Sequence, residues 1–260
     1  MALDIKCEIV ENRFISGITW LLRLKAPEIA KEAKPASFVM IRGVEDYQYD
    51  PLLRRAFAIA DIDGDDILIF YDVYGKGTKA ITEKKAGETI SVLGALGNNF
   101  FPEDYDHYVL VGGGIGFAGL SLLMKDLKQK GKSFTAIYGV RRKEQLSMLD
   151  WIKENGFEND VIIYTEDGSY GKKGLVTEDL EKIATKHHNT MLAVCGPHGM
   201  MKAVANLAKE IDIPCYVSLE SRMACGFGIC IGCVVKDTEK DSYVRVCYEG
   251  PVFDASKIEL

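Results

Sequence analysis

Four of the chain's seven cysteines lie within its last 36 residues, and their spacing restricts what this end of the chain can become. Cys225, Cys230 and Cys233 share one loop, and thirteen residues separate Cys233 from Cys247. This is the C-x4-C-x2-C…C spacing of plant-type [2Fe–2S] sites. The alternative, a structural four-cysteine zinc site, usually presents two C-x2–4-C pairs. An odd number of cysteines also fits poorly with a fully paired disulfide framework.

The residues between these cysteines suit a cluster. Glycines at positions 226, 228 and 232 let the backbone wrap closely and direct N–H groups at anionic sulfur. Glu220 and Arg222 are the only charged residues between positions 218 and 235, so the surroundings are apolar. The 46 residues from 215 to 260 are too few for a self-sufficient core, and a metal staple would account for their stability.

The rest of the chain divides into two further units that differ in composition and in the pattern of their apolar residues. Residues 1–102 contain short β-branched and aromatic segments separated by Gly, Asp and Pro, which predicts a small antiparallel barrel or sandwich. Residues 103–214 alternate apolar strands with helical segments, which predicts a parallel α/β sheet. We therefore expect three units, 1–102, 103–214 and 215–260.

A glycine loop in the second unit predicts a nucleotide site. Gly114-x-Gly116-x-x-Gly119 follows a predicted strand and opens a predicted helix, where backbone N–H groups can meet a pyrophosphate. The same turn without a ligand would be a tightly packed βα connection. The acidic residue expected about twenty positions later is absent, and Arg141 and Arg142 stand there instead, so a 2′-phosphate is also possible.

A second turn, Cys195-Gly196-Pro197, ends another predicted strand and is expected at the same edge of the sheet. Its small residues would let a nicotinamide approach a flavin, although a lone cysteine here is more often a core residue. The residues expected to contact the dinucleotide are Gly113, Gly114, Gly116, Cys195, Gly196 and Pro197.

The first unit offers candidate flavin contacts. Arg55 could hold a pyrophosphate through paired donors, Phe57 could stack on a flavin ring, and Gly77-Thr78 could present donors to phosphate. Taken alone, these are ordinary strand-end and turn residues.

Charge and hydropathy exclude some classes of protein. The net charge of −6 argues against a general nucleic-acid binder. The longest uncharged run, residues 107–124, holds five glycines and suits a strand–turn–helix better than a membrane span. The first residues lack an apolar signal core, so we expect a cytoplasmic protein.

From about residue 50 to residue 254 the chain resembles the ferredoxin-reductase superfamily and, more narrowly, the electron-transfer subunits of NAD-dependent dihydroorotate dehydrogenases. The matching stretches are LLRRAFAIAD, YGKGT, VGGGIGFAGL, EDGSYGKKG, CGPHGMM, SLESRMACGFGICIGCVV and VCYEGPVFDA. The resemblance implies FAD, one [2Fe–2S] cluster and NAD as cofactors. It also implies an FMN-containing catalytic subunit as partner, commonly in a heterotetramer that makes orotate for pyrimidine biosynthesis.

The resemblance extends to individual residues. The implied cluster ligands are Cys225, Cys230, Cys233 and Cys247, and the implied flavin contacts are Arg55, Ala56, Phe57, Ala58, Phe70, Tyr71, Asp72, Gly77 and Thr78. The chain departs from the family pattern at three of these positions. Ala56 replaces proline, Ala58 replaces serine, and Asp72 stands where the family usually has a basic residue.

The leading hypothesis is an electron-transfer subunit that links the partner's flavin, through the cluster and FAD, to NAD+. Electron transfer of this kind requires no general acid or base from the side chains of this protein. An NAD(P)H-linked reductase subunit of another complex, of hydrogenase or ferredoxin–NAD(P) reductase type, is the first alternative. A zinc-stapled nucleotide-binding regulator is the second.

Overall fold

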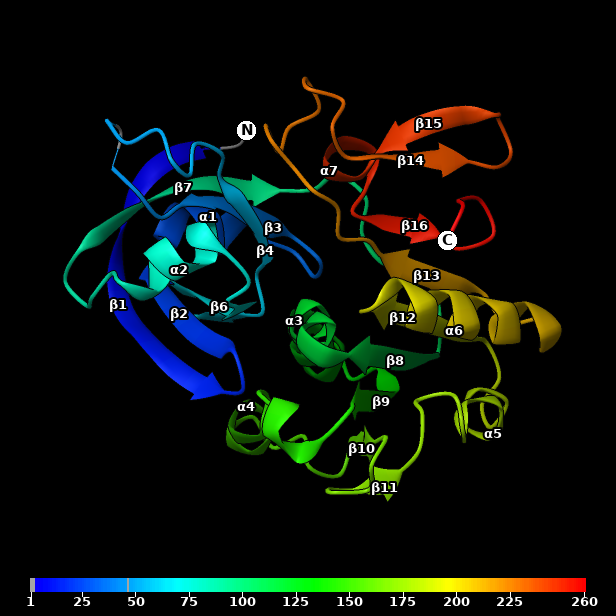
Figure 1. Ribbon diagram of the computed structural model, residues 1–260. Helices are drawn as coiled ribbons and strands as arrows, with labels where there is room; N and C mark the ends of the chain where they lie inside the picture. Colours follow the sequence, from blue (N-terminus) through cyan, green and yellow to red (C-terminus); the bar gives the residue numbers. More distant parts are fainter. Residues whose placement is uncertain (1–2, 46) are drawn as a thin grey trace.

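The computed structural model describes residues 3–45 and 47–260. Its first part is a seven-stranded antiparallel sheet in the order β4-β3-β7-β1-β2-β6-β5, curved around its own core (Figure 1). The strands are β1 (Leu3–Ser16), β2 (Thr19–Lys25), β3 (Phe38–Arg42), β4 (Arg55–Ala58), β5 (Asp61–Asp63), β6 (Asp66–Asp72) and β7 (Thr89–Leu96).

Alternating side chains form this sheet's core. In β7, every second residue from Ile90 to Leu96 is buried, as expected for a strand with one face on the core. Two short helices, α1 (Pro27–Glu32) and α2 (Lys76–Thr82), interrupt a region for which we expected strands only. Six and seven residues are too few to display a helical hydrophobic period in the sequence.

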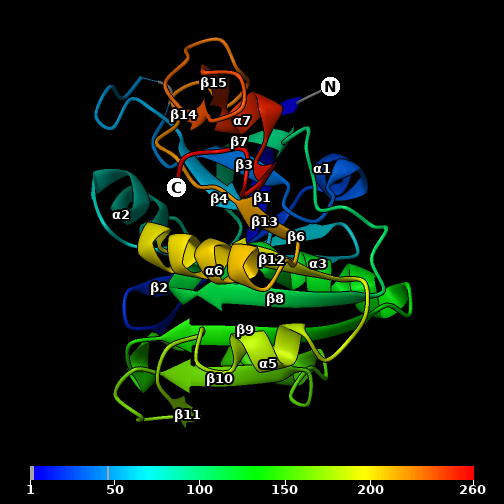
Figure 2. The same cartoon turned by 90° about the vertical axis from the view of Figure 1, so that its right-hand side faces the viewer.

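The second part is a sheet in the order β11-β10-β9-β8-β12-β13-β16, parallel except for its last pair (Figure 2). The chain leaves β8 toward β9 and β10, then returns to place β12 on the other side of β8. This makes a topological switch point between β8 and β12. The strands are β8 (His107–Gly113), β9 (Ser133–Val140), β10 (Val161–Thr165), β11 (Lys172–Lys173), β12 (Thr190–Cys195), β13 (Cys215–Ser218) and β16 (Val252–Asp254).

Helices cover both faces of this sheet. One face carries α3 (Ala118–Gln129) and α4 (Leu149–Glu154), which face the antiparallel sheet, and the other carries α5 (Leu180–Ala184) and α6 (His198–Glu210) (Figure 1). Two short 3-10 turns, η1 (Gly114–Phe117) and η2 (Lys143–Gln145), follow β8 and β9. No helix in the described part of the chain is both long and apolar enough to cross a membrane.

The last residues contribute to two structures. β14 (Val234–Asp237) and β15 (Ser242–Arg245) form an antiparallel hairpin, which is followed by α7 (Val246–Glu249). However, β13 and β16 belong to the parallel sheet, although the sequence placed them in a separate terminal unit. The overall expectation of an antiparallel barrel-like sheet, a parallel α/β sheet and a small cysteine-bearing end is confirmed.

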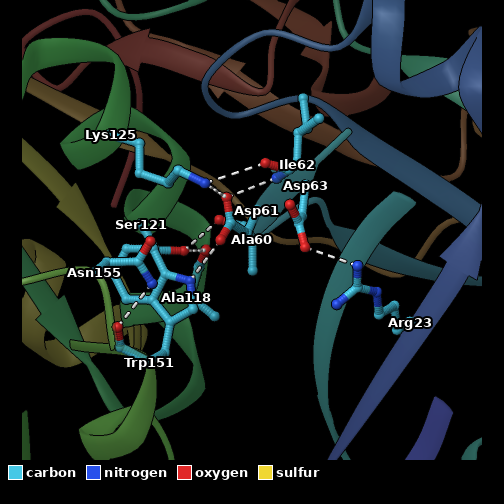
Figure 3. A network of polar contacts seen from close by, with 10 residues as sticks. All are labelled: Arg23, Ala60, Asp61, Ile62, Asp63, Ala118, Ser121, Lys125, Trp151 and Asn155. Atoms are coloured by element: carbon cyan, nitrogen blue, oxygen red, sulfur yellow. Dashed lines mark hydrogen bonds and ion pairs between the residues drawn. The ribbon is translucent and has the colours of Figure 1, made fainter. Parts of the chain in front are cut away.

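A buried polar network joins the two sheets (Figure 3). Asp61, at the start of β5, accepts hydrogen bonds from Nζ of Lys125 at 2.5 Å and from Nε1 of Trp151 at 2.8 Å. Ser121 donates a 2.6 Å hydrogen bond to the carbonyl oxygen of Ala60. The Asp61 carboxylate is almost fully buried, and its charge is balanced by the Lys125 ammonium. Its contacts with Lys125 and Trp151 therefore hold α3 and α4 against the first sheet.

Candidate functional site

A cavity of about 820 Å³ opens at the carboxyl edge of the parallel sheet, over the switch point. This is where ligands bind in open α/β sheets. Five of the six residues expected to contact a dinucleotide line it: Gly113, Gly114, Gly116, Gly196 and Pro197. The sixth, Cys195, is buried beneath them.

The two glycine turns fit against each other without room for side chains. A Cβ on Gly116 would lie 2.5 Å from Cα of Gly196, and a Cβ on Gly113 would lie 2.5 Å from Sδ of Met200. Gly196 also has a φ of +151°, which favours glycine. These glycines keep the backbone at the floor of the cavity, where a pyrophosphate can approach it closely.

The candidate flavin and nicotinamide residues converge at Gly119 in α3. A Cβ on Gly119 would lie 3.1 Å from Sγ of Cys195 and 3.8 Å from Cβ of Ala58. Residues predicted separately, in β4 and at the end of β12, therefore meet at the junction of the two sheets. Burial raises the pKa of Cys195 well above its usual range, so this thiol is a packing group and not a nucleophile.

Asp72 and Glu220 are two of the three carboxyl-bearing residues that line the same cavity. Asp72, at the end of β6, accepts hydrogen bonds from Oγ1 of Thr19 at 2.5 Å and from the Tyr74 hydroxyl at 3.1 Å. Glu220 reaches solvent through the cavity. Loss of hydration at this recessed position raises the pKa of its carboxyl group, and the negative charge of the nearby Asp72 raises it further. The Asp72 carboxylate is thus held by hydroxyl donors instead of by a basic side chain.

Arg55 and Gly77 form a cradle for an anion. A Cβ on Gly77 would lie 2.5 Å from Nε of Arg55, so the guanidinium rests directly on the glycine at the start of α2. The Thr78 hydroxyl accepts hydrogen bonds from the backbone N–H groups of Tyr74 at 3.0 Å and Gly75 at 3.3 Å. Thr78 therefore also organises the turn, in addition to any contact with phosphate.

Strand alternation separates the other predicted flavin residues. Phe57 packs edge-on against Tyr71, with ring centroids 5.7 Å apart, and both join the core of the first sheet. Phe70 and Ala56 instead pack toward the parallel sheet. The side of β4 that faces the α/β part carries only the small alanines, Ala56 and Ala58. Flavin contacts by Phe57 and Tyr71 stay predictions.

The four clustered cysteines lie as two pairs. The backbone N–H of Cys230 donates to Sγ of Cys225 at 3.5 Å, and that of Cys247 donates to Sγ of Cys233 at 3.4 Å. Within the residues described, no three His, Cys, Asp or Glu side chains converge on the position of a single metal ion. These four thiols can supply the four thiolate ligands that a [2Fe–2S] cluster takes.

The loop around Cys225 is prepared for anionic sulfur. Burial raises the pKa of this thiol, but N–H groups of Cys230, Phe227 and Ile229 outweigh that effect and bring it down to about 6. Gly226 and Gly228 adopt positive φ as expected, whereas the third left-handed residue is Ile231 and not Gly232. The donor set and the loop conformation fit a [2Fe–2S] cluster.

The cysteine loop contacts the first sheet directly. A Cβ on Gly226 would lie 2.6 Å from Cγ of Met40 in β3, and Met40 is paired with Ala56 in β4. Cys233 and Cys247 belong to the same buried apolar cluster as Met40. The candidate cluster site therefore packs against the strand next to the candidate flavin strand.

Comparison with known proteins identifies the family. Residues 220–259 match the iron–sulfur cluster binding domain of dihydroorotate dehydrogenase B, and residues 110–206 match the oxidoreductase NAD-binding domain. The chain is 41% identical, over the full length of both chains, to the dihydroorotate dehydrogenase B (NAD(+)) electron transfer subunit homolog of Aquifex aeolicus. It is 36% identical to the corresponding electron transfer subunit of Fusobacterium nucleatum, over 98% of each chain. The chain belongs to the dihydroorotate dehydrogenase B electron transfer subunit family.

A solved structure shares both the fold and a substantial part of the sequence. It comes from a study of flavin-based electron bifurcation by an NADH-dependent reduced ferredoxin-NADP oxidoreductase. The match has a TM-score of 0.85 and 32% identity, and covers 97% of this chain and 89% of the other. This chain therefore shares its fold with a protein that is named for reduced ferredoxin and NADP.

Sequence reasoning missed several cavity residues. Glu166 follows β10 and lines the cavity beside Arg141, and Glu220 follows β13 and lines its other end. Each stands one or two residues beyond a strand that could be predicted. The available signal was the rule that parallel strands end at a common edge, combined with the correct strand order.

Proposed function

We propose that this chain is an NAD-linked electron transfer subunit that works with an FMN-containing dihydroorotate dehydrogenase catalytic subunit. The observation that carries the proposal is the convergence of Ala58, Gly119 and Cys195 beside the cavity, with the cysteine loop packed on the neighbouring strand. The full-length likeness to named electron transfer subunits supports the partner.

Each part of the chain has its own task in this proposal. Residues 1–102 hold FAD, with Arg55 and Gly77 at its pyrophosphate, and residues 103–214 hold NAD at the two glycine turns. Residues 215–260 hold the cluster through Cys225, Cys230, Cys233 and Cys247. Bound flavin exchanges hydride with a nicotinamide and single electrons with an iron–sulfur centre. The protein positions these groups, and small residues at positions 58 and 119 keep the approach between them open.

The surface around the cluster is proposed to face the catalytic subunit. Phe227, Ile229 and Ile231 project from the cysteine loop with exposed fractions of 44%, 75% and 64%. An exposed apolar patch of this kind usually marks an interface. Because electrons enter or leave at the cluster, a partner docked here would shorten their path. A cytoplasmic location is part of the proposal and is supported by seven cysteines without a disulfide.

Co-expression with the FMN-containing subunit from the same source tests the function. The isolated chain should oxidise NADH with an artificial acceptor and leave dihydroorotate unchanged. The complex should couple dihydroorotate to NAD+, and Phe227→Glu should weaken the complex while NADH oxidation by the isolated chain persists. Failure of the two subunits to associate would contradict the proposal.

A second candidate is favoured by one observation, the 0.85 TM-score and 32% identity to the ferredoxin-NADP oxidoreductase component. In that case the same chain would serve a complex that uses reduced ferredoxin. A purified native complex that reduces NAD+ with reduced ferredoxin but not with dihydroorotate would establish it.

A further inference from the structure

The cavity has an end remote from Cys195, and two oppositely charged residues line it. Arg141 follows β9 and Glu166 follows β10, whereas Cys195 ends β12. The strand order β10-β9-β8-β12 places three strand spacings, roughly 14 Å, between the two ends. If the nicotinamide lies near Cys195, the adenosine half of the dinucleotide extends to Arg141 and Glu166.

The backbone holds these two residues side by side. Thr165 pairs with Val140 in the parallel ladder, and the ladder continues past the strand ends. The N–H of Glu166 donates to the carbonyl of Val140 at 3.1 Å, and the N–H of Asp167 donates to that of Arg141 at 3.2 Å. Both side chains are exposed to solvent, and within residues 3–45 and 47–260 neither forms an ion pair. A carboxylate and a guanidinium are therefore both available to a ligand.

The two groups make opposite demands on an adenosine ribose. A carboxylate accepts hydrogen bonds from the ribose hydroxyls and repels a 2′-phosphate, whereas an arginine accommodates that phosphate. We infer that Glu166 binds the adenosine ribose and selects NAD(H). This inference rests on the proposed nucleotide site. Arg141 could bind a 2′-phosphate, but the negative charge of Glu166 repels that phosphate and so prevents the contact.

Charge explains why the acid prevails. A phosphate monoester carries about −1.5 to −2 charges at neutral pH, so at this position it would meet the Glu166 carboxylate at close range. Arg141 can pair with either anion but not remove the repulsion between them. The unphosphorylated ribose meets no such penalty. Removing the single carboxylate charge should therefore release Arg141 for phosphate.

Two ligand fragments, ADP-ribose and its 2′-phosphorylated form, test binding at this end of the site without the nicotinamide. Their dissociation constants are measured by calorimetry on the purified chain with its native groups, for wild type and Glu166→Gln. Wild type should prefer ADP-ribose, and Glu166→Gln should shift the ratio of the two constants toward the phosphorylated fragment by roughly 10- to 100-fold. Steady-state KM values for NADH and NADPH should move in the same directions.

Matched variants separate the inference from general effects. Arg141→Gln in the Glu166→Gln background should abolish the gained affinity for the phosphorylated fragment, whereas Arg142→Gln, outside the cavity lining, should not. Glu154→Gln on α4 controls for loss of a surface carboxylate and should leave both constants unchanged. An unchanged ratio in Glu166→Gln, with both fragments bound, would overturn this inference alone. Failure of wild type to bind either fragment would overturn it together with the proposed nucleotide site.

Discussion

Gly226 of the cysteine loop rests on Met40 of β3 so closely that a Cβ on the glycine would lie 2.6 Å from Cγ of Met40. This contact joins the loop that carries three of the four clustered cysteines to the strand beside the candidate flavin segment. The position of the proposed cluster relative to the first sheet therefore depends on the absence of a side chain at residue 226.

Replacing this glycine should disturb the loop. Gly226 has a φ of +80°, so Gly226→Ala adds a cost of about 1–2 kcal/mol for the left-handed conformation as well as the clash with Met40. We expect reduced iron content and faster cluster loss during gel filtration. Gly75→Ala, where a Cβ would meet nothing within 4 Å, should retain wild-type iron content. Equal iron in both variants would contradict this role.

Arg55 should be needed for flavin. Arg55→Ala removes the guanidinium that lies over Gly77, and FAD affinity should fall roughly 10- to 100-fold, as for a lost charged hydrogen-bond donor. Arg54→Ala is the matched control, because Arg54 pairs with Asp4 and Ser91 on the other side of the strand end. Flavin absorbance per chain after dialysis measures the difference. Equal flavin retention by both variants would refute the assignment.

The junction between the sheets should depend on Asp61. Asp61→Asn removes the charge that pairs with Lys125 and leaves that ammonium half-buried beside Trp151, so the free energy of unfolding should fall by about 3 kcal/mol. Asp63→Asn breaks an exposed pair with Arg23 and should cost less than about 1 kcal/mol. Urea unfolding followed by tryptophan fluorescence gives both values. The account fails here if the two variants unfold alike.

His107 should make the fold sensitive to acid. Burial, and then the neighbouring His187 and Lys186 charges, lower the pKa of this imidazole to about 4. Because the unfolded state, with a pKa near 6.5, binds the proton more readily, stability should be full above about pH 6.5 and should decline as the pH falls toward 4. Each unit of depression corresponds to about 1.4 kcal/mol.

Urea midpoints between pH 4 and 8 measure this dependence. His107→Gln should flatten that part of the profile, whereas replacement of the exposed His188, in the connection between α5 and β12, by Gln should leave it unchanged. A profile for His107→Gln as steep as that of wild type would assign the acid sensitivity to other groups.

Local spacing accounts for what the sequence predicted well. The four cysteines and the turns at Gly114 and Gly196 are recognisable from a few neighbouring residues, because a metal loop and a phosphate turn each impose short-range constraints. The alternation of strands and helices likewise predicted the parallel sheet.

Other features depend on how distant segments pack, which no local pattern records. The contact of Gly119 with Ala58 and Cys195 arises only when α3 is placed between the two sheets. Glu166 reaches the cavity because β10 lies beside β9, and β13 joins the parallel sheet although its neighbours carry the cysteine loop. Short helices such as α2 are fixed by caps and tertiary contacts and not by hydrophobic period.

Iron and acid-labile sulfide per chain, measured after anaerobic purification, test the central claim most directly. The account predicts about two of each, because four thiolates hold one plant-type cluster. Cys230→Ser should lose both, and Cys215→Ser, a buried cysteine in β13 outside the two thiol pairs, should retain them. Stoichiometric zinc without iron in the wild-type chain would contradict the account.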